Sequence, residues 1–540
     1  MDKNGSSFLV IFMLSAISFM AVSATASEKH HAYWVVFTDK DHVVFDPYEY
    51  FDQRAIDRRL RHGICLYQES NFPVRQDYID SVSFYVYEAD VVSRWMNAVH
   101  VYSRPSEVHQ IASLGFVKEV IPASVRLMLA SSPGQWIPGF LFGDPDTTLL
   151  KAQLKHMGVQ RFHQQGFNGE GVRIALFDAG FSGVDSHEAF QHIREEGRIK
   201  ATWDFHRERE HVYAYSVHGT MVLSVLAGKA GDIPMGAATG ADFLLARTEI
   251  FREPLVEEKY WLAAVEWADQ HGADIINSSL GYVYHRYFPE QMDGQTSLVA
   301  RAANMAASKG ILIVNAAGNE GANEQWRVVV TPSDADSVLT VGALDYPSMV
   351  RASYSSVGPT ADGRLKPNVS ALGKVSAAGR RGYLTTTGTS FASPLVAGFA
   401  ACLWQMYPTM SNMDIFRAIE RSAHLFPYFD YGHGYGTPQS TFFLLDHSMP
   451  AAPTLDIISD TDHVSIVLRT DITAENIEYQ ADLTGNNYLY YHISDAGGQI
   501  LAYYVIKMED SNVIRKEKSI FEKGQQLLVH YKGYTTAMQF

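Results

Sequence analysis

Buried strand-like runs that alternate with amphipathic helices constrain the fold of this chain more than any other feature. Residues 172–177 are almost continuously apolar, as expected for a parallel strand covered on both faces. Four later runs have the same character: 241–246, 273–277, 311–315 and 338–341. Between them lie segments with apolar residues at helical spacing, such as Trp261, Ala264, Val265 and Ala268. The alternation predicts an α/β domain with a mostly parallel sheet, whose site lies at the carboxyl ends of the strands.

The sequence changes character on both sides of this region. The N-terminal part has a helix that opens at Pro47 and a βαβ pattern over 96–121. A stretch rich in Ser, Pro and Gly then predicts a linker. Beyond residue 450, short β-type runs without helices predict a small β-sandwich-like domain, for which a structural cap, a carbohydrate-binding module and a sorting domain all remain open. We therefore expect five segments: an N-terminal leader (1–26), an α/β region (27–130), a linker (131–149), the central α/β domain (150–445) and the β-sandwich-like domain (450–540).

The first 26 residues have the pattern of a secretory signal peptide. Lys3 provides a thin positive start, residues 8–21 are almost unbroken apolar sequence, and residues 24–26 offer small side chains for cleavage. The alternative is a membrane anchor, but the apolar run is short for a span of about 20 residues. We therefore expect an exported protein without an integral membrane span, located outside the cell, in the periplasm or at the cell surface.

Composition excludes several classes of function. Lys and Arg total 44 against 59 Asp and Glu, so the formal charge is −15, which argues against nucleic acid as a partner. Hydrophobic residues make up 46% of the chain, which excludes a disordered protein. Only two cysteines are present, which excludes a disulfide-rich scaffold and a cysteine-based zinc site. Cys402 lies in an apolar stretch and is expected to be a small buried thiol.

Three polar motifs end or open apolar elements of the central region. Asp178 ends the first buried strand, and His218 begins an apolar helix. Ser390 lies at the mouth of a long apolar helix, where backbone N–H groups and the positive helix end are close. Each alone has an ordinary explanation, as a turn, a surface histidine or a helix cap. Together they supply a nucleophile, a base that removes its proton and an acid that orients the base.

A fourth motif, Asn-Ala-Ala-Gly-Asn-Glu-Gly at 315–321, follows another buried strand. The amide of Asn319, aimed into a cleft, can donate to the oxyanion that forms when a carbonyl is attacked. The alternative is an asparagine that only supplies a turn.

These motifs, in this order, resemble the subtilisin family of serine proteases (subtilases). The similar segments are Asp178-Ala-Gly, His218-Gly-Thr, Ala-Gly-Asn319 and Gly-Thr-Ser390-Phe-Ala-Ser-Pro, within a match over about 170–440. The segment Asp178-Ala-Gly-Phe181 and the N-terminal Tyr33-Trp34 resemble secreted subtilases of the Bacteroidetes type. The resemblance implies that Ser390 is the nucleophile and His218 the general base and then acid. Asp178 would orient the imidazole, and Asn319 would complete an oxyanion hole with the Ser390 backbone N–H.

The resemblance also implies a substrate cleft with two backbone walls. The residues concerned are Ser279, Leu280 and Gly281 on one side, and Ala316, Ala317 and Gly318 on the other. The first wall would pair with an extended substrate, and the second would line the pocket for the residue before the scissile bond. Small side chains imply an open, apolar-tolerant pocket. Ala179 departs from the family, where a threonine or serine hydroxyl commonly supports the catalytic carboxylate.

The same resemblance implies a subtilisin-like three-layer domain and an α/β propeptide in 27–130, which blocks the cleft until it is cut between about 122 and 150. The alternative for 27–130 is an accessory domain that is stably retained. The expected partners are protein or peptide substrates and this propeptide, in a monomer. No cofactor is needed for the chemistry, and structural calcium is frequent in the family, although no ligands can be named.

Two other functions are alternatives to a secreted endopeptidase. A catalytically inert binding protein on the same fold would usually have lost a member of the triad, and all four polar groups are present. An esterase of the α/β-hydrolase type orders its triad serine, acid, histidine. This chain has the order aspartate, histidine, serine.

Overall fold

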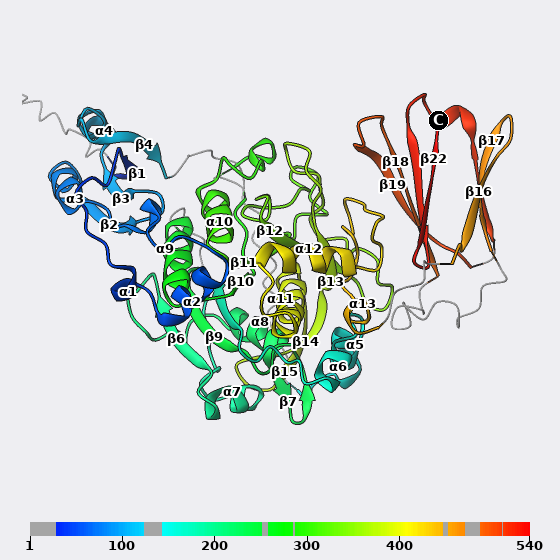
Figure 1. Ribbon diagram of the computed structural model, residues 1–540, viewed down its shortest axis with the longest axis horizontal. Helices are drawn as coiled ribbons and strands as arrows, with labels where there is room; N and C mark the ends of the chain where they lie inside the picture. The colour runs from blue at the N-terminus through cyan, green and yellow to red at the C-terminus, as the bar shows by residue number, and fades with distance from the viewer. Residues whose placement is uncertain are drawn as a thin grey trace, which may run out of the picture.

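The structure is a computed structural model, and it describes residues 29–123, 143–250, 257–283, 287–445, 452–469, 487–509 and 511–540. The predicted signal peptide and most of the predicted linker lie outside these ranges. Three units follow one another along the long axis of the molecule, with the N-terminal unit at one end, the central unit in the middle and the C-terminal unit at the other end (Figure 1). Within the described ranges, no helix combines the length and the apolar character that crossing a membrane requires.

The N-terminal unit is a four-stranded antiparallel sheet with helices on one face. Its strands are β1 (His31–Phe37), β2 (Glu88–Ser93), β3 (Ala98–Ser103) and β4 (Val117–Pro122), in the order β2-β3-β1-β4. Helices α3 (Gln76–Ser83) and α4 (Pro105–Ala112) cover one face, and β3, α4 and β4 form the predicted βαβ unit with β1 between its strands.

The helix that was predicted to open at Pro47 begins there but is broken in two. Helix α1 (Pro47–Tyr50) ends at Phe51, whose backbone is extended, and α2 (Gln53–Arg61) then starts in a new direction. A 3₁₀ turn, η1 (Glu69–Asn71), follows. This α1–η1 segment lies outside the sheet and extends along the central unit (Figure 1).

The central unit contains a seven-stranded parallel sheet with the order β13-β12-β11-β10-β5-β9-β6. Its strands are β5 (Arg173–Asp178), β6 (Ile199–Asp204), β9 (Asp242–Arg247), β10 (Ile275–Ser278), β11 (Leu312–Ala316), β12 (Val338–Leu344) and β13 (Val369–Leu372). The five predicted strands are confirmed within one to three residues. The sequence did not predict β6 and β13, which are the two edges of the sheet.

Helices on both faces of this sheet complete the predicted three layers. Helices α8 (His218–Ala227) and α11 (Thr389–Met406) pack on one face, and α9 (Glu257–Gln270) and α10 (Leu298–Ser308) pack on the other. The N-terminal sheet rests on α9, because Trp34 and Trp95 share a core with Trp261. Cys402 of α11 is buried and unpaired, as predicted. Smaller elements surround these layers: α5 (Thr147–Lys155), α6 (Val159–Gln164), α7 (Gln191–Glu195), β14 (Lys374–Ala378), β15 (Tyr383–Thr387), α12 (Asn412–Ser422) and α13 (Thr441–Leu444).

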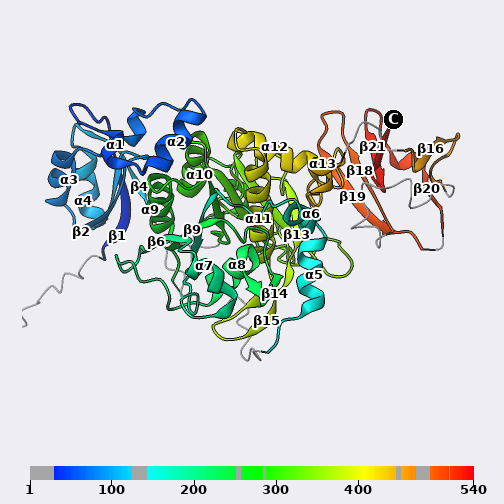
Figure 2. The same cartoon turned by 60° about the horizontal axis from the view of Figure 1, so that its bottom comes forward.

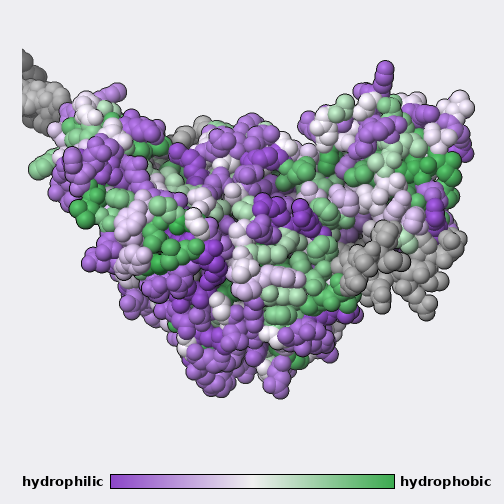
Figure 3. Space-filling view, viewed as in Figure 1, coloured by the Kyte–Doolittle hydropathy of each residue, from purple (hydrophilic) through white to green (hydrophobic). Residues whose placement is uncertain are grey.

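The C-terminal unit consists of two antiparallel sheets around a common apolar core, as the sequence predicted. One sheet contains β16 (Leu455–Ser459), β17 (His463–Leu468) and β20 (Val513–Glu517), and the other contains β18 (Tyr488–Ser494), β19 (Ile500–Lys507), β21 (Gln526–Tyr531) and β22 (Tyr534–Gln539). The unit lies on the side of the central unit away from the N-terminal unit in both views (Figures 1 and 2). Figure 3 shows mostly hydrophilic residues over the lower part of the central unit on the face seen there.

Candidate active site

The structure brings Asp178 and His218 together at the carboxyl end of β5. Asp178 is the last residue of that strand and is fully buried, and His218 is the first residue of α8. The His218 Nδ1 atom lies 2.8 and 2.9 Å from the two carboxylate oxygens of Asp178. The imidazole itself is 31% exposed. One side of the ring is therefore held by a buried acid while the rest remains accessible.

Asp178 changes the protonation behaviour of this histidine. Burial alone lowers the pKa of the His218 imidazole, but the charge of Asp178 and its hydrogen bond outweigh burial, so the pKa lies above its ordinary value. The Asp178 carboxylate also accepts a hydrogen bond of 2.7 Å from the backbone N–H of Ala179. Ala179 has no side-chain hydroxyl that could support the carboxylate, but its backbone N–H provides a donor. Ser216 Oγ accepts from the His218 backbone N–H at 3.0 Å, a contact that the sequence did not predict.

Ser390 lies in the first turn of α11, beside this pair. The ring of its neighbour Phe391 contacts the His218 imidazole, with ring centroids 5.7 Å apart. The Ser390 hydroxyl donates to the backbone oxygen of Ser279 at 3.2 Å, and the Ser279 hydroxyl donates back to the Ser390 backbone oxygen at 2.9 Å. The hydroxyl is thus directed to Ser279 rather than to the imidazole. Catalytic hydrogen bonds are often loose without substrate and tighten when it binds.

Asn319 follows β11 and is exposed, and its side-chain amide is fixed by the residue before Ser390. Its Oδ1 atom accepts from the backbone N–H and from the hydroxyl of Thr389, both at 3.0 Å. Because the oxygen half of the amide is held there, the Nδ2 half is left as a donor beside the first turn of α11. Thr389 was missed by the sequence analysis, which treated it only as part of the serine motif.

The two predicted walls of the cleft leave neighbouring parallel strands at the same edge of the sheet. Ser279, Leu280 and Gly281 directly follow β10, and Ala316, Ala317 and Gly318 end and follow β11. Asn315 Nδ2 donates to the Leu280 backbone oxygen at 3.0 Å and so ties the walls together.

Val330 occupies the space between these walls. A Cβ atom added to Gly281 would come within 2.1 Å of one Val330 methyl, and one added to Gly318 within 2.7 Å of the other. The Val330 backbone N–H donates to the Ala317 oxygen at 3.1 Å, which holds this side chain in place. A branched, buried side chain therefore lies between the two walls, where the sequence predicts an open pocket. No part of the motif pattern pointed to Val330, which lies in a loop.

Among the residues that the structure describes, no group of three or more His, Cys, Asp or Glu side chains could hold a metal ion. Structural calcium therefore stays a prediction without assigned ligands. The groups that do converge are a buried carboxylate, an imidazole that it orients, a hydroxyl and an amide donor. Such a set can transfer a proton from the hydroxyl and stabilise negative charge on an attacked carbonyl oxygen.

Two family profiles match this chain. Residues 169–436 match the subtilase family of peptidases, and residues 32–134 match the peptidase S8 propeptide domain of Bacteroidota. The first match contains all four predicted catalytic positions, and the second coincides with the N-terminal unit and the start of the linker.

Individual relatives match the central region. Subtilisin NAT of Bacillus subtilis subsp. natto is 31% identical over 275 residues, covering 50% of this chain and 66% of that protein. Subtilisin of Bacillus pumilus is 30% identical over 273 residues, covering 50% of this chain and 91% of that protein. The crystal structure of fervidolysin from Fervidobacterium pennivorans, described as a keratinolytic enzyme related to subtilisin, covers 93% of this chain and 71% of its own, with a TM-score of 0.51 at 18% identity. That last likeness concerns the fold alone.

Proposed function

This chain belongs to the subtilase family and carries a propeptide domain of the Bacteroidota type, and from this premise we propose that it is an exported serine endopeptidase. The observation that carries the proposal is the pairing of a fully buried carboxylate with Nδ1 of a partly exposed imidazole. With its proton on Nδ1, the neutral ring has a free Nε2 lone pair to act as a base.

The reaction proceeds through an acyl-enzyme. His218 takes the proton of the Ser390 hydroxyl as its oxygen attacks the scissile carbonyl, and the protonated imidazole then gives that proton to the leaving amine. A water molecule attacks the resulting ester in the same way, with His218 again as base, and releases the second product. Asp178 holds the tautomer and stabilises the imidazolium, which agrees with the raised pKa of His218.

Asn319 and the backbone N–H of Ser390 bind the oxyanion of each tetrahedral intermediate. Thr389 fixes the Asn319 amide before the substrate arrives, so little reorganisation is needed when charge develops. For scale, loss of one such donor in subtilisin lowers turnover by roughly 10²–10³.

Substrate selection rests on the two backbone walls. Pairing with an extended peptide through main-chain groups tolerates varied sequences. Val330, between Gly281 and Gly318, leaves room for small residues before the scissile bond rather than for aromatic ones. The N-terminal unit is the propeptide, cut from the enzyme between about residues 122 and 150, and the signal peptide directs export.

Replacement of the nucleophile tests this function. The Ser390→Ala variant should lose proteolysis of a mixed peptide library, by a factor on the order of 10⁶ if it behaves as subtilisin does. The control is Ser308→Ala, an exposed serine in α10 whose hydroxyl bonds only within its own turn. If Ser390→Ala were as active as the wild type, the assignment of Ser390 as the nucleophile would be refuted. A folded wild type without activity on any peptide, even after removal of the N-terminal unit, would instead favour the inert binding protein.

A further inference from the structure

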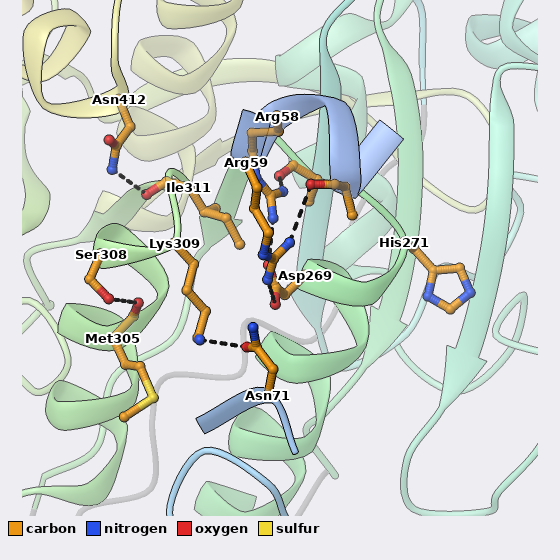
Figure 4. Close-up of polar contacts among 12 residues, drawn as sticks. Arg58, Arg59, Asn71, Asp269, His271, Met305, Ser308, Lys309, Ile311 and Asn412 are labelled. Atoms are coloured by element: carbon orange, nitrogen blue, oxygen red, sulfur yellow. Dashed lines mark hydrogen bonds and ion pairs between the residues drawn. The ribbon is translucent and has the colours of Figure 1, made fainter. Parts of the chain in front are cut away.

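A second contact between the N-terminal and central units lies away from the four-stranded sheet. It is made by α2 and η1, which rest on the C-terminal ends of α9 and α10 (Figure 4). Figure 4 shows two arginine side chains of α2 directed at Asp269, and the Lys309 side chain directed at Asn71. The residues involved come from segments more than 200 positions apart in the sequence.

Asp269 of α9 has both of its carboxylate oxygens bound by the N-terminal unit. Arg58 donates to one oxygen and Arg59 to the other, and Arg58 also donates to the backbone oxygen of Ala273. The two guanidinium groups and the carboxylate are almost completely buried. Asp269 lies in the last turn of α9, where the helix dipole disfavours a negative charge and where α9 has no basic residue. Among the described residues, the side-chain hydrogen bonds to this carboxylate therefore both come from α2.

Lys309 is a buried positive charge of the central unit that is also hydrogen-bonded by the N-terminal unit. It follows α10 and is fully buried, and its ammonium donates to Gln68 Oε1, Ser70 Oγ and Asn71 Oδ1 at 3.1, 2.8 and 2.7 Å. All three acceptors belong to the N-terminal unit. Burial lowers the pKa of Lys309 to about 8. Within the described ranges, the side-chain hydrogen bonds to these two charges of the central unit thus come from the α2–η1 segment.

A third pair lies at the edge of this contact. Arg54 of α2 binds Asp274 and the backbone oxygen of Gly171, and its side chain is 29% exposed. Buried ionic groups of this kind contribute little net stability over apolar packing, but removing one partner is costly, because the other charge is left buried and unpaired.

We propose that the C-terminal ends of α9 and α10 form a recognition surface for a helix with paired arginines, and that its occupant is the α1–η1 segment, residues 47–71. This segment is a second docking element, separate from the sheet contact, and it slows release of the N-terminal unit once the linker is cut. The inference rests on the proposed function only in taking the N-terminal unit as a propeptide that is cut off.

Controlled cleavage of the full chain measures how fast the N-terminal unit is released. In a Ser390→Ala background, a recognition sequence for a site-specific protease is inserted between residues 131 and 138, the folded chain is cut, and release of the N-terminal unit is followed by size-exclusion chromatography. Because no self-cleavage is needed, failure of the proposed function would leave this assay unaffected. In the parent chain the two pieces should remain together.

Asp269→Asn should release the N-terminal unit at least tenfold faster than the parent. The matched control is Asp77→Asn. Asp77 is an exposed carboxylate of the N-terminal unit that pairs with Arg75, and this variant should release the N-terminal unit at the parental rate. A separate arm is Glu266→Gln, which removes the carboxylate that accepts from Ser93 and from the backbone of Arg94 and Trp95 at the sheet contact. If Glu266→Gln accelerates release and Asp269→Asn does not, the docking element is overturned.

A second variant covers the case in which Asp269→Asn fails to fold. Arg54→Ala removes a partly exposed side chain at the edge of the surface and should still accelerate release severalfold. Circular dichroism of the uncut variants establishes folding before cleavage. A parental release rate in Arg54→Ala, joined by a parental rate in Asp269→Asn where that variant folds, would refute the proposal.

Discussion

The carboxylates of Asp178 and Asp269 are both buried in the central unit, but they serve different kinds of partner. Asp178 binds one imidazole that is still 31% exposed, and beside it the Ser390 hydroxyl has only a 3.2 Å bond to a backbone oxygen. Asp269 binds two arginines that are themselves buried. The first region keeps polar atoms available for a substrate. In the second region, both carboxylate oxygens of Asp269 already accept hydrogen bonds from the N-terminal unit. Availability of polar atoms, more than their number, separates a candidate site for chemistry from a docking surface.

Of changes at the two carboxylates, Asp178→Asn should have the larger effect on turnover. The fold should persist, because an amide of the same shape remains, but the imidazole would lose the acid that selects its tautomer. We expect turnover to fall by a factor on the order of 10⁴, the loss associated with this change in serine proteases. Initial rates on a peptide substrate, measured with enzyme freed of its N-terminal unit, provide the value. A loss of less than tenfold would contradict the assigned role.

Asp269→Asn should have the opposite profile. It leaves two arginines buried beside a neutral amide, and breaking a buried pair destabilises a protein by roughly 3–5 kcal/mol. Urea unfolding of the uncut chain in the Ser390→Ala background measures this loss, with Asp77→Asn expected to change stability by less than about 0.5 kcal/mol. With Ser390 intact, turnover of the cut and separated Asp269→Asn enzyme should equal that of the wild type. If turnover fell as it does in Asp178→Asn, the two regions would not be independent.

Within the site, Val330→Gly should widen the pocket between Gly281 and Gly318. The ratio of kcat/KM for a substrate with phenylalanine before the scissile bond to that for the alanine substrate should rise about tenfold or more, the range that one or two methylene groups give in an apolar pocket. Paired kinetic measurements on the two substrates test this. An unchanged ratio would show that Val330 does not limit the pocket.

The two regions should also respond to pH differently. At the site, neutral His218 is the active form, so kcat/KM should fall with decreasing pH around a midpoint above about 6.5, because Asp178 raises the pKa of the imidazole. At the docking surface, Lys309 has a folded-state pKa of about 8, below its unfolded value near 10.4. Between those values the unfolded chain holds more protons, so stability should rise with pH from about 8 to 10.

Lys309→Met isolates the second response. The variant should show a flatter rise in the free energy of unfolding between pH 8 and 10, while the pH profile of kcat/KM stays that of the wild type. Identical stability slopes in the variant and the wild type would contradict the assignment to Lys309.

The sequence predicted the interior of the sheet and the residues that converge at its edge better than it predicted the periphery. Strands β5 and β9–β12 are buried on both faces and are almost continuously apolar, a pattern that is visible locally. Strand β6 mixes Lys200 and Thr202 with apolar residues because it forms an edge, and β13 has only four residues, so neither gave a clear signal. Motif order brought Asp178, His218, Ser390 and Asn319 together, but not the residues that hold them.

The docking surface could not be read from one sequence. Arg58 and Arg59 lie in a short, strongly charged helix, which locally is typical of a solvated face. Their burial depends on Asp269, which is 210 positions away and also looks like an ordinary helix surface residue. Val330 and Thr389 were missed for a similar reason, since their roles follow from which loops the fold places side by side. Contacts between distant segments leave no periodicity or spacing in the chain.

Covalent labelling of the nucleophile tests the central claim most directly. The separated enzyme is treated with a fluorophosphonate, and the modified residue is identified by mass spectrometry. We predict a single adduct on Ser390, formed in the wild type and in Asp269→Asn but lost in His218→Ala. A folded wild type without an adduct on Ser390, or equally fast labelling of Ser390 in His218→Ala, would contradict the account.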